Sequence, residues 1–332
     1  MVAKDFDLRS NTAEGGCATS LKATSHMRHF IAIADCTEAE LRHVMDVSLR
    51  LKKQLKETGR NDPVLAGKTL AMIFEKPSLR TRVSFAVGMT QLGGNGLVLR
   101  QEEVGLGTRE PIQDVARVLS SMCDGIMART FEHEKVTGLA KWSGVPVVNG
   151  LTDYSHPCQA MADLMTLIEH FGNLKGRTMA FIGDGNNVAR SLSVACAKFG
   201  MKFILAAPQG YDLPADDLNR IRAQVPQMDF RTTRDVREAV RNADAIVTDT
   251  WVSMGQEAEK ARRVKEFAGF QVNDTLLAAA PNHAVVLHCL PAYRGMEISE
   301  EVMEGPRSLI FPEAENRLHV QKGLLAVLMG GL

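Results

Sequence analysis

Short apolar runs alternate with segments of helical periodicity from residue 27 to the end of the chain. In the first half the apolar runs have the length of strands and fall at 69–74, 96–99, 125–128 and 145–148. Comparable runs in the second half fall at 178–182, 203–206, 245–248 and 285–288. Strands that alternate with helices are typical of parallel sheets covered on both faces. The pattern therefore predicts an α/β protein with two doubly wound domains, each with a central parallel sheet flanked by helices.

Helix signals and glycine breaks divide this pattern into parts. Thr37 and Glu40 form a capping box that predicts a helix to about residue 56, and Pro111 is typical of a first helical position. Further helices are expected at 156–171, from 187, at 214–224 and after Pro312, with a polar loop over 100–110. A chain of 332 residues suggests two domains, and the glycines within 172–176 mark the linker. We expect a first domain over 27–172, a second over 173–311, and a C-terminal helix over 312–332.

Residues 1–26 do not share this pattern. They are rich in Ser, Thr, Ala and Gly, and they lack the apolar segment of a secretory signal. Asp5, Asp7 and Glu14 offset the basic residues, which is unlike an organelle transit peptide. We expect a mobile N-terminal extension or a segment added for expression, with the natural start near Met27.

Composition argues against several classes of partner. Lys and Arg together number 39, as do Asp and Glu, so the formal net charge is zero and nothing indicates nucleic acid or an acidic membrane surface. No apolar run approaches the roughly 18 residues that a membrane span needs. The six cysteines include no Cys-x-x-Cys pair, which favours a reducing compartment over a disulfide scaffold. We therefore expect a cytoplasmic protein that binds neither nucleic acid nor membranes.

The strongest chemical signal lies in the stretch 74–94, where an expected strand, a break and a helix follow one another. Ser78 is the predicted N-cap, and the first turn would place its hydroxyl and that of Thr81 beside free backbone N–H groups. Arg80 and Arg82 add two guanidinium groups. A helix N-terminus with these groups suits a dianionic phosphate. The alternative is an ordinary capped helix with solvated arginines, but the preceding strand and the two hydroxyls favour the phosphate site.

Further loops with chemically useful side chains follow other expected strands, where open parallel sheets bind ligands. The segments are His156-Pro-Cys-Gln159, Gly183-Asp-Gly-Asn-Asn187, Asp249-Thr-Trp-Val-Ser-Met-Gly255, His288-Cys-Leu-Pro291 and, at the start of the last helix, Glu313-Ala-Glu-Asn-Arg317. A neutral imidazole and a carboxamide on one helical turn can address both faces of a small amide-like group. Taken singly, each segment is more often a helix cap or a structural feature, and only the whole set indicates a binding site.

Two cofactor hypotheses fail on spacing. The glycine turn at 183–187 lies where a dinucleotide fingerprint would, but Val188 occupies the sixth position in place of Gly or Ala. Cys158 lies between His156 and Gln159, but no second pair of ligands has the spacing of a zinc site. We therefore expect no nucleotide cofactor and no metal.

The chain contains, in this order, the motifs Ser-x-Arg-Thr-Arg, His-Pro-x-Gln, Gly-Asp-Gly-Asn-Asn, Asp-x-x-x-Ser-Met-Gly, His-Cys-Leu-Pro and Glu-Asn-Arg. With this ordered set, the chain resembles the aspartate/ornithine carbamoyltransferase family from about Arg28 to the end. The resemblance implies a carbamoyl-phosphate domain followed by an ornithine domain, with the C-terminal helix over 312–332 packing back on the first domain. It also implies transfer of the carbamoyl group of carbamoyl phosphate to the δ-amine of L-ornithine, which gives L-citrulline and phosphate without a cofactor. A homotrimer, or a multiple of trimers, is implied as well, with a loop from the neighbouring subunit in each site.

The resemblance implies a role for each candidate residue. The residues that would hold the phosphate are Ser78, Leu79, Arg80 and Thr81, with positive charge added by Arg317. The groups around the carbamoyl unit would be Thr81, Arg129 and His156 at its oxygen, and Gln159 with the backbone around Cys289 and Leu290 at its NH2 group. The ornithine contacts would be Asn187, Asp249, Ser253 and Met254. Asp249 and Cys289 would bind the side-chain ammonium group and help it lose a proton, because only the neutral amine attacks.

Two positions depart from the family pattern. Leu79 stands where ornithine enzymes usually have Thr, so we expect the loss of one hydrogen bond to phosphate, about 1 kcal/mol. Gly105 replaces a polar residue in the loop that enters the neighbouring site, and Arg109 is our candidate for the intersubunit cation. The alternatives are a carbamoyltransferase for an N-acylated ornithine or putrescine, and a binding relative without catalysis. A nucleotide-dependent oxidoreductase is disfavoured by the failed glycine pattern.

Overall fold

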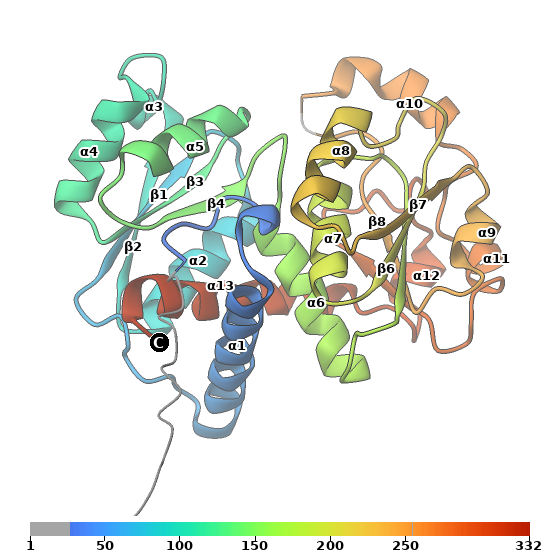
Figure 1. The fold of residues 1–332 in the computed structure, drawn as a ribbon, viewed down its shortest axis with the longest axis horizontal. Helices are drawn as coiled ribbons and strands as arrows, with labels where there is room; N and C mark the ends of the chain where they lie inside the picture. The colour runs from blue at the N-terminus through green and yellow to red at the C-terminus, as the bar shows by residue number, and fades with distance from the viewer. Residues whose placement is uncertain (1–26, 254) are drawn as a thin grey trace, which may run out of the picture.

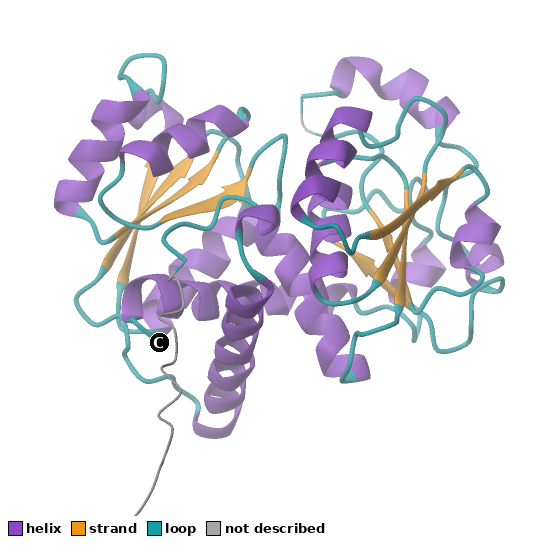
Figure 2. Ribbon diagram, in the orientation of Figure 1, coloured by secondary structure: helices purple, strands orange, loops and turns teal. Residues whose placement is uncertain are grey.

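The computed structural model describes residues 27–253 and 255–332, and in it the chain forms two lobes that lie side by side (Figure 1). Each lobe is built on one sheet of parallel strands with helices on both faces (Figure 2). This confirms the predicted α/β class with two doubly wound parallel sheets. Residues 1–26, for which we predicted a mobile extension, lie outside the described part of the chain.

The first sheet has the strand order β2-β1-β3-β4. Its strands are β1 (Thr69–Phe74), β2 (Asn95–Arg100), β3 (Gly125–Arg129) and β4 (Val147–Leu151). The helices of this half are η1 (Ile33–Asp35), α1 (Glu38–Thr58), α2 (Leu79–Gln91), α3 (Gln101–Val104), α4 (Ile112–Met122), α5 (His133–Trp142) and α6 (Pro157–Phe171). Strand β3 is buried at every residue, which explains its uninterrupted apolar sequence up to the terminal Arg129.

The second sheet has the strand order β7-β6-β5-β8-β9. Its strands are β5 (Thr178–Ile182), β6 (Lys202–Ala206), β7 (Asp229–Thr233), β8 (Ala245–Thr248) and β9 (Val285–His288). The helices in this half of the chain are α7 (Asn187–Lys198), α8 (Ala215–Gln224), α9 (Val236–Val240), η2 (Glu257–Glu259), α10 (Lys260–Glu266), α11 (Asp274–Leu277), α12 (Glu300–Glu304) and α13 (Ile310–Gly330). Strands β5, β8 and β9 are buried throughout and form the apolar centre of this lobe.

Several predicted boundaries are wrong by a few residues. The strand predicted at 145–148 begins only at Val147, since Pro146 has no N–H to donate to the sheet. The predicted polar loop contains one helical turn, α3, which Gly105 ends with a φ of 63°. Pro111 is the N-cap of α4 instead of its first helical residue. The last helix begins at Ile310, and Pro312 lies in its first turn, where a missing N–H costs no hydrogen bond.

Other elements were not predicted at all. Strand β7 lies at the edge of its sheet, and its sequence Asp-Phe-Arg-Thr-Thr has mostly polar, exposed residues, so no apolar run marks it. Helix α5 and the short helices α9 to α12 were also missed. Elements at edges and on surfaces bury too few side chains to impose a strong periodicity on the sequence.

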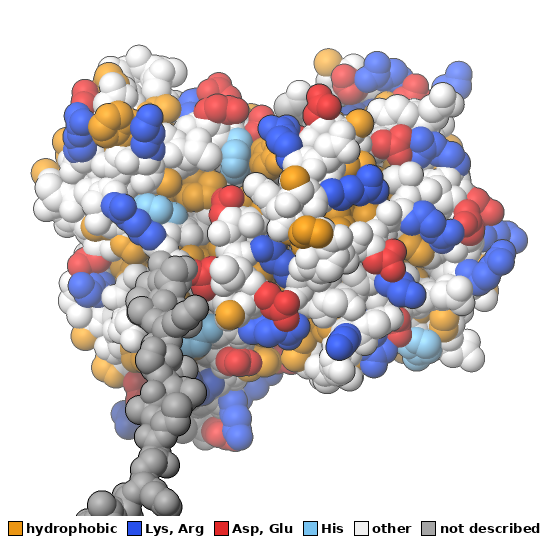
Figure 3. Space-filling model, in the orientation of Figure 1, with side chains coloured by type: hydrophobic (Ala, Val, Ile, Leu, Met, Phe, Trp, Pro, Cys, Tyr) orange, Lys and Arg blue, Asp and Glu red, His pale blue; other side chains and the backbone are white. Residues whose placement is uncertain are grey.

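Figure 3 shows Lys and Arg side chains interspersed with Asp and Glu over the face drawn, which agrees with the balanced formal charge. In the part of the chain that the structure describes, none of the helices has the combination of length and apolar character needed to cross a bilayer.

The final helix returns from the second lobe to the first. Helix α13 packs against α1, α2 and α6, and it is the red helix beside α1 in Figure 1. Where it crosses α1, a Cβ atom added at Gly323 would lie 2.0 Å from Ser48 Oγ and 2.8 Å from the Ser48 backbone nitrogen. Glycine is therefore required at this crossing, because any side chain would force the two helices apart.

We predict that Gly323→Ala lowers the free energy of unfolding by about 1–3 kcal/mol, because overpacking at the α1–α13 crossing outweighs the gain in helix propensity. Urea unfolding followed by circular dichroism measures the change. Gly269→Ala is the control, since a Cβ atom there would meet no atom within 4 Å. Equal stability of the two variants would show that the helices separate without cost.

Candidate functional site

A cavity of about 810 Å³ lies between the two lobes. Its wall is formed mainly by the segments that follow β1, β3 and β4 in the first sheet and β5, β6, β8 and β9 in the second. These are the carboxyl ends of parallel strands, where open α/β sheets bind their ligands. The volume lies within the roughly 300–1,000 Å³ that is typical of small-molecule sites.

One end of the cavity is built on the first turn of α2. Ser78 is the N-cap, as predicted, and its hydroxyl accepts a hydrogen bond from the Thr81 N–H at 3.3 Å. Thr81 Oγ1 in turn accepts from Arg129 Nη1 at 3.2 Å and from Arg317 Nη2 at 3.4 Å. Arg80 lines the same cavity. Guanidinium groups from three elements thus converge on a helix N-terminus, which suits an anion with two negative charges.

Lys76, Arg129 and Arg317 are buried at this end, and their positive charges repel one another. Burial, and then the charge of Arg317, lowers the pKa of the Arg129 guanidinium to about 9. Burial and the same arginines lower the pKa of His156 well below its ordinary value, so the imidazole is neutral. Burial, and then the charge of Arg129, lowers the pKa of Lys76. A bound anion would offset this repulsion and raise these pKa values.

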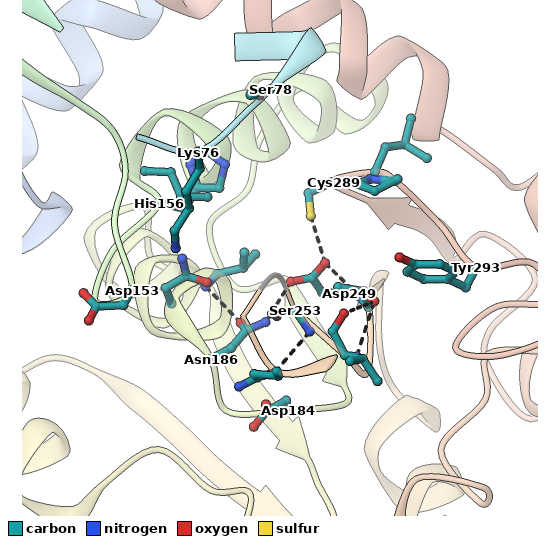
Figure 4. Close-up of a pocket in the computed structure, with 18 of the residues that line it drawn as sticks. Lys76, Ser78, Asp153, His156, Asp184, Asn186, Asp249, Ser253, Cys289 and Tyr293 are labelled. Atoms are coloured by element: carbon teal, nitrogen blue, oxygen red, sulfur yellow. Dashed lines mark hydrogen bonds between the residues drawn. The ribbon is translucent and has the colours of Figure 1, made fainter. Parts of the chain in front are cut away.

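The opposite end carries a carboxyl group paired with a thiol. The Cys289 thiol donates to Asp249 Oδ1 at 3.1 Å, and Asn186 Nδ2 donates to Asp249 Oδ2 at 2.7 Å. Figure 4 shows the sulfur directed at Asp249, with Lys76 and His156 on the other side of the cavity. Burial, and then the charge of Asp249, raises the pKa of the Cys289 thiol well above its ordinary value. This end therefore offers a carboxyl group and a neutral thiol to an amine.

The same end includes a trio of residues with metal-binding atoms. Asp249, His288 and Cys289 each offer one ligand atom, and these atoms lie within 4.8 Å of one another. However, His288 Nδ1 accepts from the Leu290 N–H at 2.9 Å, and its Nε2 lies 3.1 Å from Glu297 Oε1. Because both ring nitrogens are engaged, His288 has no lone pair free for a metal. The trio does not fit a metal site.

Comparison with known families decides the relationship. The model of the carbamoyl-P binding domain of aspartate/ornithine carbamoyltransferases matches residues 28–169, and the model of their Asp/Orn binding domain matches residues 175–328. The chain belongs to the aspartate/ornithine carbamoyltransferase family.

Individual relatives cover nearly the whole chain. An ornithine carbamoyltransferase of Carboxydothermus hydrogenoformans is 51% identical over 307 residues, which is 91% of this chain and 98% of the relative. The solved ornithine carbamoyltransferase from Pyrococcus furiosus is 45% identical with a TM-score of 0.88, covering 92% of this chain and 98% of its own. An anabolic ornithine carbamoyltransferase from Campylobacter jejuni is 38% identical with a TM-score of 0.84, over 91% and 99% of the two chains.

Most residues predicted from the family motifs line the cavity. They are Ser78, Leu79, Arg80, Thr81, Arg129, His156, Asn187, Asp249, Ser253, Cys289, Leu290 and Arg317. The side chain of Leu79 is 75% exposed, and Asn187 Nδ2 donates to the Thr152 carbonyl of the other lobe at 2.6 Å. Met254, predicted to contact ornithine, lies outside the described residues.

Gln159 is buried and is not part of the cavity wall. Its carbonyl oxygen accepts from Arg317 Nη1 at 2.7 Å, and its NH2 group donates to Asp163 and Glu313. This geometry differs from the predicted direct contact with a carbamoyl NH2 group, because the carboxamide is already used on both sides.

Two predicted cations lie away from this cavity. Arg82 is exposed on α2 and does not line the cavity, since residues two apart on a helix point in different directions from Arg80. Arg109 donates to the carbonyls of Glu103 and Val104 at the end of α3, within its own loop. Its role at a neighbouring subunit stays a prediction.

The structure also brings in residues that the sequence patterns did not indicate. Lys76 lines the cavity with its ammonium 4.0 Å from the centre of the Phe131 ring. Asp153 follows β4, and Arg263 donates to Asp184, within the glycine turn already noted, at 2.7 Å. Lys76 could have been noticed, because it precedes the phosphate turn directly. Asp153 and Arg263 face the cavity only through tertiary packing, which no local spacing reveals.

We predict that Asp249→Asn increases the rate at which iodoacetamide alkylates Cys289 by about threefold or more. Removing the negative charge lowers the pKa of the thiol and raises the thiolate fraction at a given pH. Peptide-level mass spectrometry over about pH 7 to 9 measures the rate, with Cys123 on the far side of the first lobe as the internal control. A slower or unchanged rate at Cys289 would contradict the role of the Asp249 charge.

Proposed function

We propose that this chain transfers the carbamoyl group of carbamoyl phosphate to the δ-amine of L-ornithine, giving L-citrulline and phosphate. The main support for the proposal is that the two ends of one cavity differ in charge, with buried arginines at one end and the Asp249–Cys289 pair at the other. An activated carbonyl compound with a dianionic phosphate fits the first end, and a side-chain amine fits the second. Relatives named ornithine carbamoyltransferase, 46% to 51% identical to the chain, support the assignment.

The phosphate is held by the first turn of α2. Ser78, Arg80 and Thr81 supply a hydroxyl, a guanidinium and backbone N–H groups, and Arg317 adds positive charge. Backbone donation does not depend on the side chain at position 79, so the largely exposed Leu79 is compatible with phosphate binding. Neutralising the charge of the phosphate makes it a good leaving group, and for this reason the reaction needs no cofactor.

The carbamoyl oxygen is stabilised by Thr81, Arg129 and His156. These donors become most valuable as negative charge develops on that oxygen in the tetrahedral intermediate. Because its pKa is lowered, His156 donates as a neutral imidazole and adds no further charge to a cluster that is already cationic. The carbamoyl NH2 group needs acceptors, and we assign them to backbone carbonyls around Cys289 and Leu290, with Gln159 acting behind Arg317.

The ornithine amine is received by Asp249 and Cys289. Asp249 binds the side-chain ammonium, which loses one proton to solvent, and the neutral amine then attacks the carbonyl carbon to form the tetrahedral intermediate. As the intermediate collapses, the bond from that carbon to the phosphate oxygen breaks, and the phosphate leaves with the second proton of the amine nitrogen. Asn187, Ser253 and Met254 are assigned to the amino-acid end of ornithine. The nearby Cys289 thiol remains protonated, so it donates to Asp249 and does not act as a nucleophile itself.

The wider assignments follow from the same proposal. Residues 27–172 form the carbamoyl-phosphate domain, residues 173–311 form the ornithine domain, and residues 312–332 return to the first. We infer a cytoplasmic homotrimer, or a multiple of trimers, in which the loop around α3 lies at a subunit contact and Arg109 provides the intersubunit cation.

A citrulline assay with carbamoyl phosphate tests the proposal on three amines: L-ornithine, N-acetylornithine and putrescine. We expect turnover with L-ornithine to exceed turnover with either alternative by at least about tenfold. Preference for N-acetylornithine would overturn the substrate assignment. The absence of citrulline or any carbamoylated product would support a binding relative without catalysis.

We predict that Cys289→Ala lowers kcat by at least about tenfold and changes the affinity for carbamoyl phosphate much less. The thiol orients Asp249 at the amine end and lies away from the phosphate turn. Steady-state kinetics together with carbamoyl-phosphate titration separate the two effects. Cys289→Ser, which keeps a donor for Asp249, should retain more turnover than the alanine variant. Equal losses of kcat and affinity would refute this role.

A further inference from the structure

A buried carboxyl group that the proposed chemistry does not use lies directly behind Arg317. Glu313 lies in the first turn of α13 and is 1% exposed. Its Oε1 accepts from Gln159 Nε2 at 2.6 Å, and its Oε2 accepts from the backbone N–H of His288 at 2.9 Å. Asp163 Oδ1 accepts from the same Gln159 nitrogen at 2.7 Å. The NH2 group of Gln159 is thus held between two acids.

This arrangement fixes the direction of the Gln159 carboxamide. With its NH2 group between the acids, its carbonyl oxygen is turned to Arg317, whose Nη1 donates to it at 2.7 Å. A flipped carboxamide would place NH2 against a guanidinium, which has donors only, and oxygen against two acids. The fixed Arg317 then reaches Thr81 Oγ1 with its Nη2 at 3.4 Å.

We propose that Glu313 is a positioning residue of the carbamoyl-phosphate site, acting through Gln159 on Arg317 and through the backbone of His288 on Cys289. The inference rests on the proposed function and deepens it. Glu313 does not line the cavity, so it acts only through these neighbours. Its two oxygens connect the anion end of the cavity with the strand end that carries Cys289. One carboxyl group therefore aligns both halves of the reaction.

The geometry of Glu313 matters more than its charge. Burial raises the pKa of both Asp163 and Glu313, so this enclosed pair does not hold two full negative charges. The two acids differ in the number of N–H donors they serve. Asp163 accepts from one, the Gln159 amide, whereas Glu313 accepts from that amide and from the His288 backbone. Only Glu313 needs both oxygens in place.

Two substitutions separate geometry from charge. Glu313→Asp keeps a carboxyl group but withdraws it by one methylene, so it no longer spans both donors. Asp163→Asn removes the charge but keeps an acceptor oxygen for Gln159. Glu315→Asp is the matched control, because it makes the same change on the same helix at a side chain that is 48% exposed.

Calorimetric titration with inorganic phosphate, steady-state kinetics and thermal unfolding are measured for each variant. We expect Glu313→Asp to weaken phosphate binding and raise the KM for carbamoyl phosphate about 10- to 100-fold, the loss that accompanies one hydrogen bond to a charged group. Its kcat should also fall, while the KM for ornithine changes less than about threefold. Asp163→Asn and Glu315→Asp should shift phosphate affinity by less than about threefold.

Other results would overturn the proposal. If Asp163→Asn weakens phosphate binding as much as Glu313→Asp does, charge and not geometry is decisive. If Glu313→Asp lowers only the melting temperature, Glu313 is merely structural. Should Glu313→Asp fail to fold, Glu313→Gln, with one acceptor oxygen in place of two, must show the same loss of phosphate affinity. A wild-type protein that binds phosphate but makes no citrulline would defeat the proposed function, while the phosphate titrations would still test Glu313.

Discussion

Repulsion between buried cationic groups is the constraint on which the site depends. Arg80 of α2, Arg129 of β3 and Arg317 of α13 converge near Thr81 and His156, and burial already lowers the pKa of Arg129. Such a cluster is unfavourable without an anion, so the surrounding fold must hold it together. The benefit is preorganisation: donors that already point into the cavity need little rearrangement when charge develops on a substrate oxygen.

The last helix provides much of that restraint. Helix α13 carries Arg317 to the first lobe, and buried polar contacts fix how the helix is rotated about its axis. Asn316 accepts from the ammonium of Lys52 at 2.7 Å, and Lys322 donates to Asn61 at 2.7 Å. With the close approach at Gly323, these contacts specify one register of α13 against α1 and the neighbouring segments. A slip of one residue would turn Arg317 away from the cavity and leave buried lysines without partners.

The sequence predicted what depends on local pattern. Central strands such as β1 and β8 were found at their observed bounds, because burial on both faces requires continuous apolar runs. The phosphate turn was recognisable because the N-cap Ser78 and its arginines are neighbours in the chain. The edge strand β7 was not, since its polar residues carry no such run. The inward placement of Lys76 and the burial of Gln159 behind Arg317 depend on contacts between distant segments, which spacing along the chain does not encode.

At the two ends of the cavity, pKa shifts in opposite directions keep the hydrogen-bonding groups neutral. Burial beside arginines lowers the pKa of His156, while burial beside Asp249 raises the pKa of Cys289. Neither group therefore changes its charge near neutral pH, and the field across the cavity is set by the arginines and by Asp249. A side-chain amine with an ordinary pKa near 10 is mostly protonated under the same conditions. In the proposed reaction, attack near neutral pH is thus limited by deprotonation of the ornithine amine. The protein contributes charges that do not change while that amine loses its proton.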